Sequence, residues 1–323
     1  MTDRIRRGAL AAAIALLPAS VFAEDYPTRP ITDIVASTPG GGTDIISRIV
    51  SEQLAKQLGQ PFVVDNIPGA GSLNGTLTAA KAAPDGYTLT TGLIASMAVN
   101  PSLFAHLPYD PIRDFEPIAM LAKFPFAVVV SKNFPAHSIN ELIALAKAKP
   151  GEINFASAGA GTGQHLSAEL FQLLTGIKLT HVPYRGAQPA YADIISGQVP
   201  VFFDNLASAL GQIQGGNVRA LAVTGTKRSP LLPDVPTVAE SGVPDYQYYV
   251  WFGLWAPKKT PQPIIDKLRA EVEKALAEPD VQRRIAADGG EPFNLPLAEI
   301  TPFVQAEIAK WADVVKRTGV TVQ

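Results

Sequence analysis

Short apolar runs alternate with segments of helical periodicity along most of the chain, and this alternation constrains the fold more than any other feature. In one segment Ile46, Val50, Leu54 and Leu58 recur every fourth residue, and Gly59 marks the helix end. The runs that predict strands are 31–36, 62–65, 88–94, 117–122, 126–131, 153–156, 179–182, 201–204 and 218–223. Such alternation predicts an α/β fold, with parallel sheets covered by helices on both faces.

Two extended segments predict a division of the chain into two lobes. Residues 120–130 predict two strand pieces that are broken at Pro125, and residues 246–257 form a long aromatic run. Two strands that cross together between two bodies act as a hinge. The alternative is a single large sheet with an irregular edge, which composition alone does not exclude. The expected lobes are a discontinuous first lobe of residues 24–124 and 249–323, and a second lobe of residues 125–248.

The first residues predict a secretory signal peptide. Arg4, Arg6 and Arg7 form a basic start, a short apolar run follows, and the segment ends with small residues up to Ala23. This order is typical of a signal peptide over residues 1–23 with cleavage after Ala23. A membrane anchor is the alternative, but the apolar run is too short to span a bilayer. We therefore expect an exported protein that resides in the periplasm.

Charge and residue counts narrow the function further. A formal net charge of −2 argues against nucleic acid as a partner, because the phosphate backbone selects basic surfaces. The chain has no cysteine, which excludes disulfides and zinc-thiolate sites. Its four histidines lack metal-ligand spacing, and no G-x-S-x-G nucleophile motif is present. These observations argue against nucleic-acid binding and indicate no zinc-thiolate site, metal-ligand motif or nucleophile motif in the sequence.

A glycine-rich turn in the stretch STPGGGTDIISRIV joins the first predicted strand to the first predicted helix. Such a turn exposes backbone N–H groups and the positive end of the helix dipole, which suits an anion. The phosphate-binding pattern is absent because Thr43 and Asp44 follow the glycines, and Ile45 breaks the dinucleotide-binding G-x-G-x-x-G pattern. We therefore predict that the turn holds a small carboxylate rather than a polyphosphate.

A second turn of the same kind, SAGAGTGQHL over residues 157–166, follows the strand predicted at 153–156. If the lobes face each other, two helix N-termini point into one cleft, and each holds one end of a ligand with two anionic groups. Ligands of open α/β sheets bind beyond the carboxyl ends of strands, where both turns lie. The alternative for either turn is a tight strand-to-helix connection without a ligand.

For several polar residues the sequence allows both a ligand-binding role and a structural role. His165 either hydrogen-bonds a ligand or caps its own helix, and Asp204 either caps the next helix or faces the cleft. Asp44 opposes a nearby anion, so it either orients water or meets an amine of the ligand. His181 lies in a strand pattern and is expected to be a core residue. A third glycine stretch at 65–76 either cradles a ligand or shapes a loop.

A string of motifs covers nearly the whole mature chain. In order it reads TPGGGTD, DNIPGAGSLNGT, AAPDGYTL, NPSLFAHLPYDPIRDFEPIAML, SAGAGTGQHLSAELF, VPYRGAQPA, GQVPVFFDN, RALAVTGTKRSPLLPDVPTVAESG and WFGLWAPKKTP. This string resembles the Bug family, the periplasmic substrate-binding proteins of tripartite tricarboxylate transporters. The resemblance implies a type II periplasmic binding-protein fold, with two α/β lobes joined by hinge strands around a central cleft. It also implies binding of small carboxylates or related compounds, without enzymatic activity or a cofactor.

The resemblance further implies which residues contact the ligand, because the family's contacts come largely from loops after the first strands of each lobe. The positions that match are Pro39, Gly40, Gly41, Thr43, Asp44, Ser96, Ser157, Ala158, Gly159, Gly161, Thr162, Tyr184 and Asp204. His165 joins this set from its place in the second turn. Ile67 departs from the family pattern, in which arginine is frequent, and Ser72-Leu73-Asn74 replaces a Gly-Asn-Ile run. These departures leave the identity of the ligand open.

The expected function is capture of a small organic carboxylate by a monomer that delivers it to membrane transporter subunits. A ligand-sensing protein that docks a periplasmic sensor domain is an alternative that the sequence does not separate from transport. A secreted enzyme is a further alternative, and it requires a nucleophile–base pair or a metal cluster that no sequence motif indicates.

Overall fold

The structure is a computed structural model that describes residues 26–321, so the predicted signal peptide lies outside the described residues. The strands are β1 (Ile31–Val35), β2 (Phe62–Asn66), β3 (Thr88–Leu93), β4 (Phe115–Ser131), β5 (Asn154–Ser157), β6 (Thr180–Pro183), β7 (Val201–Asn205), β8 (Val218–Val223), β9 (Tyr249–Pro257) and β10 (Glu291–Pro292). The α-helices are α1 (Gly42–Leu58), α2 (Leu73–Ala80), α3 (Asn100–Leu103), α4 (Ile139–Ala148), α5 (Gly163–Thr175), α6 (Ala187–Ser196), α7 (Leu206–Gln214), α8 (Gln262–Ala277), α9 (Pro279–Ala287) and α10 (Leu297–Thr318). A 3₁₀ turn, η2 (Ala70–Ser72), and a π-helical turn, η3 (Ala95–Val99), complete the elements.

Two groups of parallel strands are joined through β4 and β9. β1 pairs in parallel with β2 and β3, and β5 pairs in parallel with β6 and β7. The path of pairing runs β2-β1-β3-β9-β4-β7-β5-β6. Among the described strands, every antiparallel pair involves β4 or β9. The predicted α/β class is therefore confirmed.

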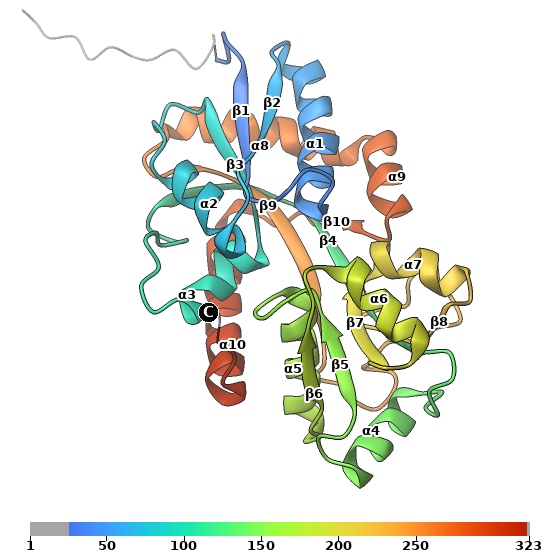
Figure 1. Ribbon diagram of the computed structural model, residues 1–323. Coiled ribbons are helices and arrows are strands. Elements are labelled where there is room, and N and C mark those ends of the chain that lie inside the picture. Colours follow the sequence, from blue (N-terminus) through green and yellow to red (C-terminus); the bar gives the residue numbers. More distant parts are fainter. Residues whose placement is uncertain (1–25, 322–323) are drawn as a thin grey trace, which may run out of the picture.

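The two groups form two lobes, which Figure 1 shows one above the other. We call the part with β1, β2, β3, α1 and α2 the first lobe, and the part with β5, β6, β7 and α4 to α7 the second lobe. The residue boundaries drawn between the lobes from the sequence stay a prediction. No helix between residues 26 and 321 is both long and apolar enough to cross a membrane.

Local sequence signals set the helix ends. The side chain of Ser138 accepts a hydrogen bond from the Glu141 N–H at 3.2 Å, which starts α4 as its sequence predicts. Gly59 adopts the left-handed conformation at φ +67° and ends α1. Along α1 the predicted apolar stripe is buried, with Ile46, Val50 and Leu54 at its centre.

The break predicted at Pro125 is wrong, because β4 is one continuous strand that runs through both lobes. It pairs with β9 up to Pro125, with β7 from Phe126 onward and with β8 from Ala127 onward. A proline cannot donate a backbone hydrogen bond within a ladder. Pro125 stands where one ladder ends and the next begins, so its position does not interrupt the strand.

Thr224 holds the two crossing segments together at this point. Its buried hydroxyl accepts a hydrogen bond from the Phe126 N–H at 2.6 Å and donates one to the Tyr248 carbonyl at 2.7 Å. The Tyr248 N–H in turn donates to the Thr224 carbonyl at 3.0 Å. One threonine therefore links the start of the second-lobe part of β4 to the segment that leads into β9.

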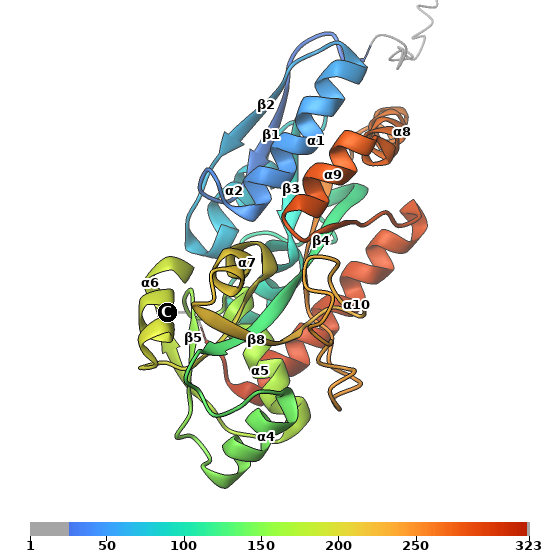
Figure 2. The ribbon, with the colours of Figure 1, turned by 90° about the vertical axis from the view of Figure 1, so that its right-hand side faces the viewer.

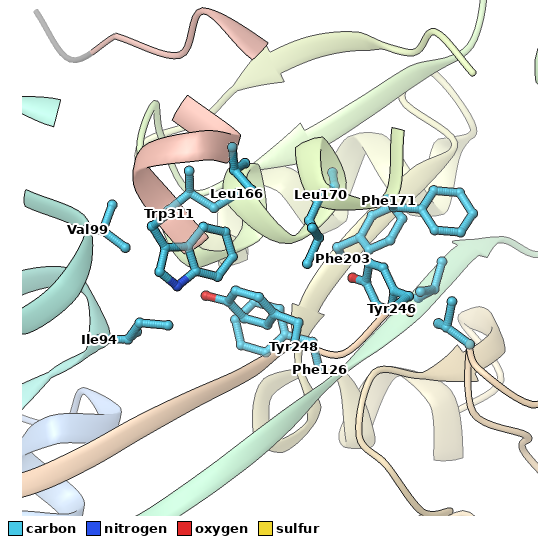
Figure 3. Close-up of a cluster of buried hydrophobic side chains, with 14 of the residues drawn as sticks. Ile94, Val99, Phe126, Leu166, Leu170, Phe171, Phe203, Tyr246, Tyr248 and Trp311 are labelled. Carbon is cyan, nitrogen blue, oxygen red and sulfur yellow. The ribbon is translucent and has the colours of Figure 1, made fainter. Parts of the chain in front are cut away.

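A single hydrophobic cluster extends across both lobes. Figure 3 shows Ile94 and Val99 from the first lobe near Trp311, with Leu166 and Phe203 of the second lobe in the same cluster. The indole ring of Trp311, which is fully buried, meets the ring of Tyr248 edge-on at 5.6 Å. Because α10 carries Trp311 and contacts η3, α3, α5 and β4, it packs on both lobes.

Candidate functional site

A cavity of about 760 Å³ opens between the two lobes, and we call it the cleft cavity. Its first-lobe wall comes from η2, the end of β3 and the segment through α3, and its second-lobe wall comes mainly from the turn between β5 and α5. The lining residues are Ala70, Gly71, Ser72, Leu93, Ala95, Asn100, Leu103, Phe104, Ala160, Gly161, Thr162, Gly163, Pro183 and Thr321. Within residues 26–321, no charged side chain lines this cavity.

The second glycine turn supplies one end of the cleft cavity. Gly159 and Gly161 adopt positive φ angles of 135° and 75°, which glycine accommodates without a side-chain clash. Thr162 is the N-cap residue of α5, but its hydroxyl donates to the Gly159 carbonyl at 2.7 Å and does not cap the helix. The first turn of α5 has no acidic residue. This helix N-terminus therefore faces the cavity without a carboxylate of its own first turn to compensate its positive dipole end.

The third glycine stretch supplies the opposite end. Ala70, Gly71 and Ser72 all have positive φ angles, and Ser72 is the N-cap residue of α2. The amide of Asn100, a buried residue of α3, donates to the Gly71 carbonyl at 3.0 Å and fixes this strained turn. Neither a side-chain cap nor an acidic first-turn residue compensates α2. The N-termini of α2 and α5 thus both lie at the lining of the cavity.

The first glycine turn lies outside the lining of the cleft cavity. Asp44 accepts a hydrogen bond from the Gly40 N–H at 2.9 Å, so the chain's own carboxylate occupies the turn. Its oxygens also accept from Arg48 at 2.9 Å and from the Asn66 amide at 2.9 Å. Burial raises the pKa of the Asp44 carboxyl, but these hydrogen bonds outweigh burial and hold the pKa below its ordinary value. The neighbours Pro39 and Gly41 and the buried Thr43 also lie outside the lining, and ligand contact by this turn stays a prediction.

Two stacked imidazole rings pack against the second glycine turn. The rings of His165 and His181 lie 3.7 Å apart and nearly parallel, at 11°. The Nδ1 atom of His165 accepts from the Gly161 N–H at 3.1 Å, so this residue caps the turn. Burial, and then the adjacent His165, lower the pKa of His181 to about 4. His181 is therefore neutral near pH 7, and it lies partly buried in the second lobe.

Ser157 and His181 form a hydroxyl–imidazole pair, with Oγ and Nε2 2.6 Å apart. Such a pair activates a nucleophile in some enzymes. Here the Ser157 side chain is fully buried and also accepts from the Gly159 N–H at 3.0 Å. The pair therefore holds the turn in shape and does not reach the cleft cavity. Ala158 lies beside it, also outside the lining.

Asp204 is buried on β7 beneath the same turn. Its carboxylate accepts from the Gln164 amide at 3.1 Å, from the Tyr191 hydroxyl at 2.9 Å and from the Ser208 hydroxyl. Burial raises the pKa of this carboxyl above its ordinary value, against these hydrogen bonds. Because Gln164 belongs to the first turn of α5, Asp204 anchors that helix end from behind the cavity wall.

Two further expected residues lie beside the lining. The Ser96 hydroxyl is buried and bonds the backbone of Leu93, its N–H at 3.3 Å and its carbonyl at 3.2 Å. The Tyr184 hydroxyl donates to Asp193 at 2.5 Å, and burial followed by Asp193 raises the pKa of Tyr184 to about 12. Their sequence neighbours Ala95 and Pro183 line the cavity instead.

Sequence reasoning missed most of the first-lobe wall. The glycine stretch at 65–76, which fits either a ligand cradle or a loop, is the sequence signal for Gly71 and Ser72. Nothing in the sequence pattern marked Leu103, Phe104 or Thr321, because their position depends on how α3 and α10 pack.

Sequence reasoning also missed a buried carboxylate, Asp33 on β1. It accepts hydrogen bonds from the Ser47 hydroxyl at 2.5 Å, from the Thr91 hydroxyl at 2.6 Å and from the Thr91 N–H at 2.7 Å.

Comparison with known proteins places the chain in a family. Residues 46–320 match the tripartite tricarboxylate transporter family receptor. Protein BugT of Bordetella pertussis is 40% identical over 308 residues, which cover 95% of this chain and 94% of BugT. The structure of R. palustris Rpa4515 with adipate superposes with a TM-score of 0.82 at 36% identity, over 92% of this chain and 99% of that one. The structure of MatC from Rhodopseudomonas palustris with bound malate superposes with a TM-score of 0.78 at 35% identity, over 90% of this chain and 100% of that one. The chain therefore belongs to the receptor family of the tripartite tricarboxylate transporters, as the Bug-type motifs indicate.

Proposed function

We propose that this chain is a periplasmic receptor that captures a small organic carboxylate in the cleft cavity. The observation that carries the proposal is the N-terminus of α5, which opens on the cavity without a compensating carboxylate of its own. Backbone N–H groups at a helix N-terminus bind anions, and the helix dipole adds to the attraction. The relatives with adipate and with malate support a carboxylate as the ligand.

The walls of the cleft cavity favour a ligand with an apolar body. Leu93, Leu103 and Phe104 supply apolar surface to the first-lobe wall. Burial of methylene groups against such a wall is favourable, whereas a buried ligand hydroxyl needs a hydrogen-bond partner. We therefore expect an unbranched dicarboxylate such as adipate to bind more tightly than malate. Each carboxylate would meet one helix N-terminus, α2 at one end and α5 at the other.

Binding would close the lobes around the ligand through the hinge formed by β4 and β9. A ligand shifts such an equilibrium only by its differential affinity for the closed state. Contacts to both Gly71 and Gly163 would form together only when the lobes are close enough for one ligand to span the cavity. These contacts would therefore supply the extra affinity for the closed state. Delivery to membrane transporter subunits, export by the predicted signal peptide and the absence of substrate turnover belong to the same proposal.

A thermal-shift experiment tests the proposal. The protein is unfolded and refolded to remove any bound ligand, and then heated with adipate, malate or benzoate. Ligand at a hundred times its dissociation constant adds about 2.7 kcal/mol of stability, which raises the melting temperature by several degrees. We expect adipate to give the largest shift and purified protein to leave it chemically unchanged.

The variant Ala160→Trp adds a bulky ring to the exposed alanine on the second-lobe wall. It should fill the cavity and abolish the shift, while its own melting temperature in the absence of ligand stays near that of the wild type. The matched control is Ala83→Trp, at an exposed position that does not line the cleft cavity. Equal shifts in both variants would remove the cleft cavity as the binding site.

A further inference from the structure

A second cavity, of about 230 Å³, lies against the strands that connect the lobes, and we call it the hinge pocket. It shares no lining residue with the cleft cavity. Its lining residues are Lys123, Gln247, Tyr249, Trp251, Phe293, Leu295, Phe303, Glu307 and Lys310. In Figure 2, α10, which carries three of these residues, lies on the opposite side of the molecule from α2 and α6.

The register of β4 and β9 separates the two cavities. Lys123 is the direct cross-strand partner of Trp251, and Tyr249 follows on the same face of β9. Phe252 points to the other face, and its cross-strand partner on β3 is Leu93, which lines the cleft cavity. A ligand in the hinge pocket therefore contacts the crossing strands from behind the cleft.

The walls of the hinge pocket are aromatic. The Phe303 ring lies 5.4 Å from the Trp251 ring at 65° and 5.3 Å from the Phe293 ring at 74°. These edge-to-face pairs fix the three rings against one another, and they present ring edges and faces that suit packing of another aromatic ring. Leu295 adds aliphatic surface beside them.

The lysine ammonium groups of the hinge pocket, on Lys123 and Lys310, keep N–H groups that can donate to a ligand. Lys123 lies over the Tyr249 and Phe293 rings at 4.5 and 5.1 Å, and its nearest carboxylate oxygen, on Glu291, is 3.3 Å away. Lys310 contacts the Gln247 carbonyl at 3.4 Å and Glu307 at 3.6 Å, both long for a charged hydrogen bond. Each ammonium has three N–H donors, so both can donate a hydrogen bond to a ligand oxygen.

The acidic residue of the hinge pocket is already engaged. Glu307 accepts hydrogen bonds from the indole N–H groups of Trp251 at 3.0 Å and Trp311 at 3.2 Å. The charges on the lining residues are thus two ammonium groups and one carboxylate, which leaves a net positive charge. A cationic ligand would meet Lys123, which already covers two of the ring faces.

We propose that the hinge pocket is a second binding site, and that its ligand is a small aromatic monocarboxylate. The ring of the ligand packs on the wall formed by Trp251, Phe293 and Phe303. Its carboxylate is held by the ammonium groups of Lys123 and Lys310. The pocket volume suits a single ring with a short polar group, in contrast to the larger cleft cavity.

The test uses the full chain, refolded to remove ligand, and 4-fluorobenzoate as the probe, followed by fluorine NMR. The pocket variants are Lys310→Met and Lys123→Met, which remove an ammonium group and keep the apolar stem. The matched control is Lys316→Met, at an exposed position of the same helix. Ala160→Trp fills the cleft cavity, and 4-fluorobenzamide provides a neutral probe of the same shape. Thermal unfolding checks that each variant is folded.

We expect saturable binding of 4-fluorobenzoate that Lys310→Met weakens by about tenfold, the usual effect of losing a charged hydrogen bond. Lys123→Met should weaken it similarly, while Lys316→Met and Ala160→Trp should leave it unchanged, and the neutral amide should bind at least tenfold less well. The proposal is overturned by an absence of saturable binding at millimolar probe, by loss of binding in Ala160→Trp, or by equal affinities in Lys310→Met and Lys316→Met.

Discussion

Replacement of Thr224 by valine should loosen the connection between the lobes, because valine keeps the shape of threonine and removes its hydroxyl. In the folded protein this hydroxyl accepts from the Phe126 N–H and donates to the Tyr248 carbonyl, and all three residues are buried. A buried polar group left without a partner costs about 1–3 kcal/mol, so the two groups together cost about 2–6 kcal/mol. The added methyl group of valine recovers about 0.8 kcal/mol.

Urea unfolding followed by tryptophan fluorescence measures this loss. We expect Thr224→Val to lower the free energy of unfolding by about 1–5 kcal/mol, with a matching fall in melting temperature. Thr224→Ser is the control, because it keeps the hydroxyl and loses only a methyl group, at about 1 kcal/mol. If serine destabilises as much as valine, the packing of the methyl group matters and the two hydrogen bonds do not, which would refute the reasoning.

Two further predictions concern Asp33 and Thr162. Burial raises the pKa of Asp33 from 3.8 to about 6, so the folded state keeps this proton to a higher pH than the unfolded state, and wild-type stability falls as pH rises from about 4 to about 6. Asp33→Asn removes this titration, so its stability relative to the wild type should rise across that window by about 2 kcal/mol, measured by urea unfolding at several pH values; a constant difference would contradict the assignment. Thr162→Val removes the hydrogen bond to the Gly159 carbonyl and should weaken adipate binding several-fold by calorimetry, whereas unchanged affinity would show that the turn keeps its shape without it.

The α/β class and the family could be predicted from the sequence because both rest on local patterns. Apolar periodicity predicted the buried stripe of α1, and Ser138 predicted the start of α4 through a cap that depends on neighbouring residues alone. The break at Pro125 was predicted wrongly from an equally local rule. That rule assumes that the same ladder continues on both sides of the proline, whereas β4 changes partners at this residue.

The candidate site was harder to predict from the sequence than the fold, because the two glycine turns look alike until their side chains are placed. The first turn carries Asp44, whose carboxylate folds back onto the Gly40 N–H, while the turn into α5 carries no such residue. Sequence spacing does not show which way a carboxylate points. The presence of Gly71, Ser72 and Thr321 in the lining of the cleft cavity follows from tertiary packing that no local pattern encodes.

Selective glycine labelling with ¹⁵N tests the central claim most directly, since glycines mark all three turns. The labelled, refolded protein is titrated with adipate, and the backbone amide signals are assigned by single substitutions. The account predicts the largest shifts at Gly71, Gly161 and Gly163, which line the cleft cavity, and small shifts at Gly40 and Gly42. Large shifts at Gly40 and Gly42 with little change at Gly163 would place the ligand at the head of α1 and contradict the account.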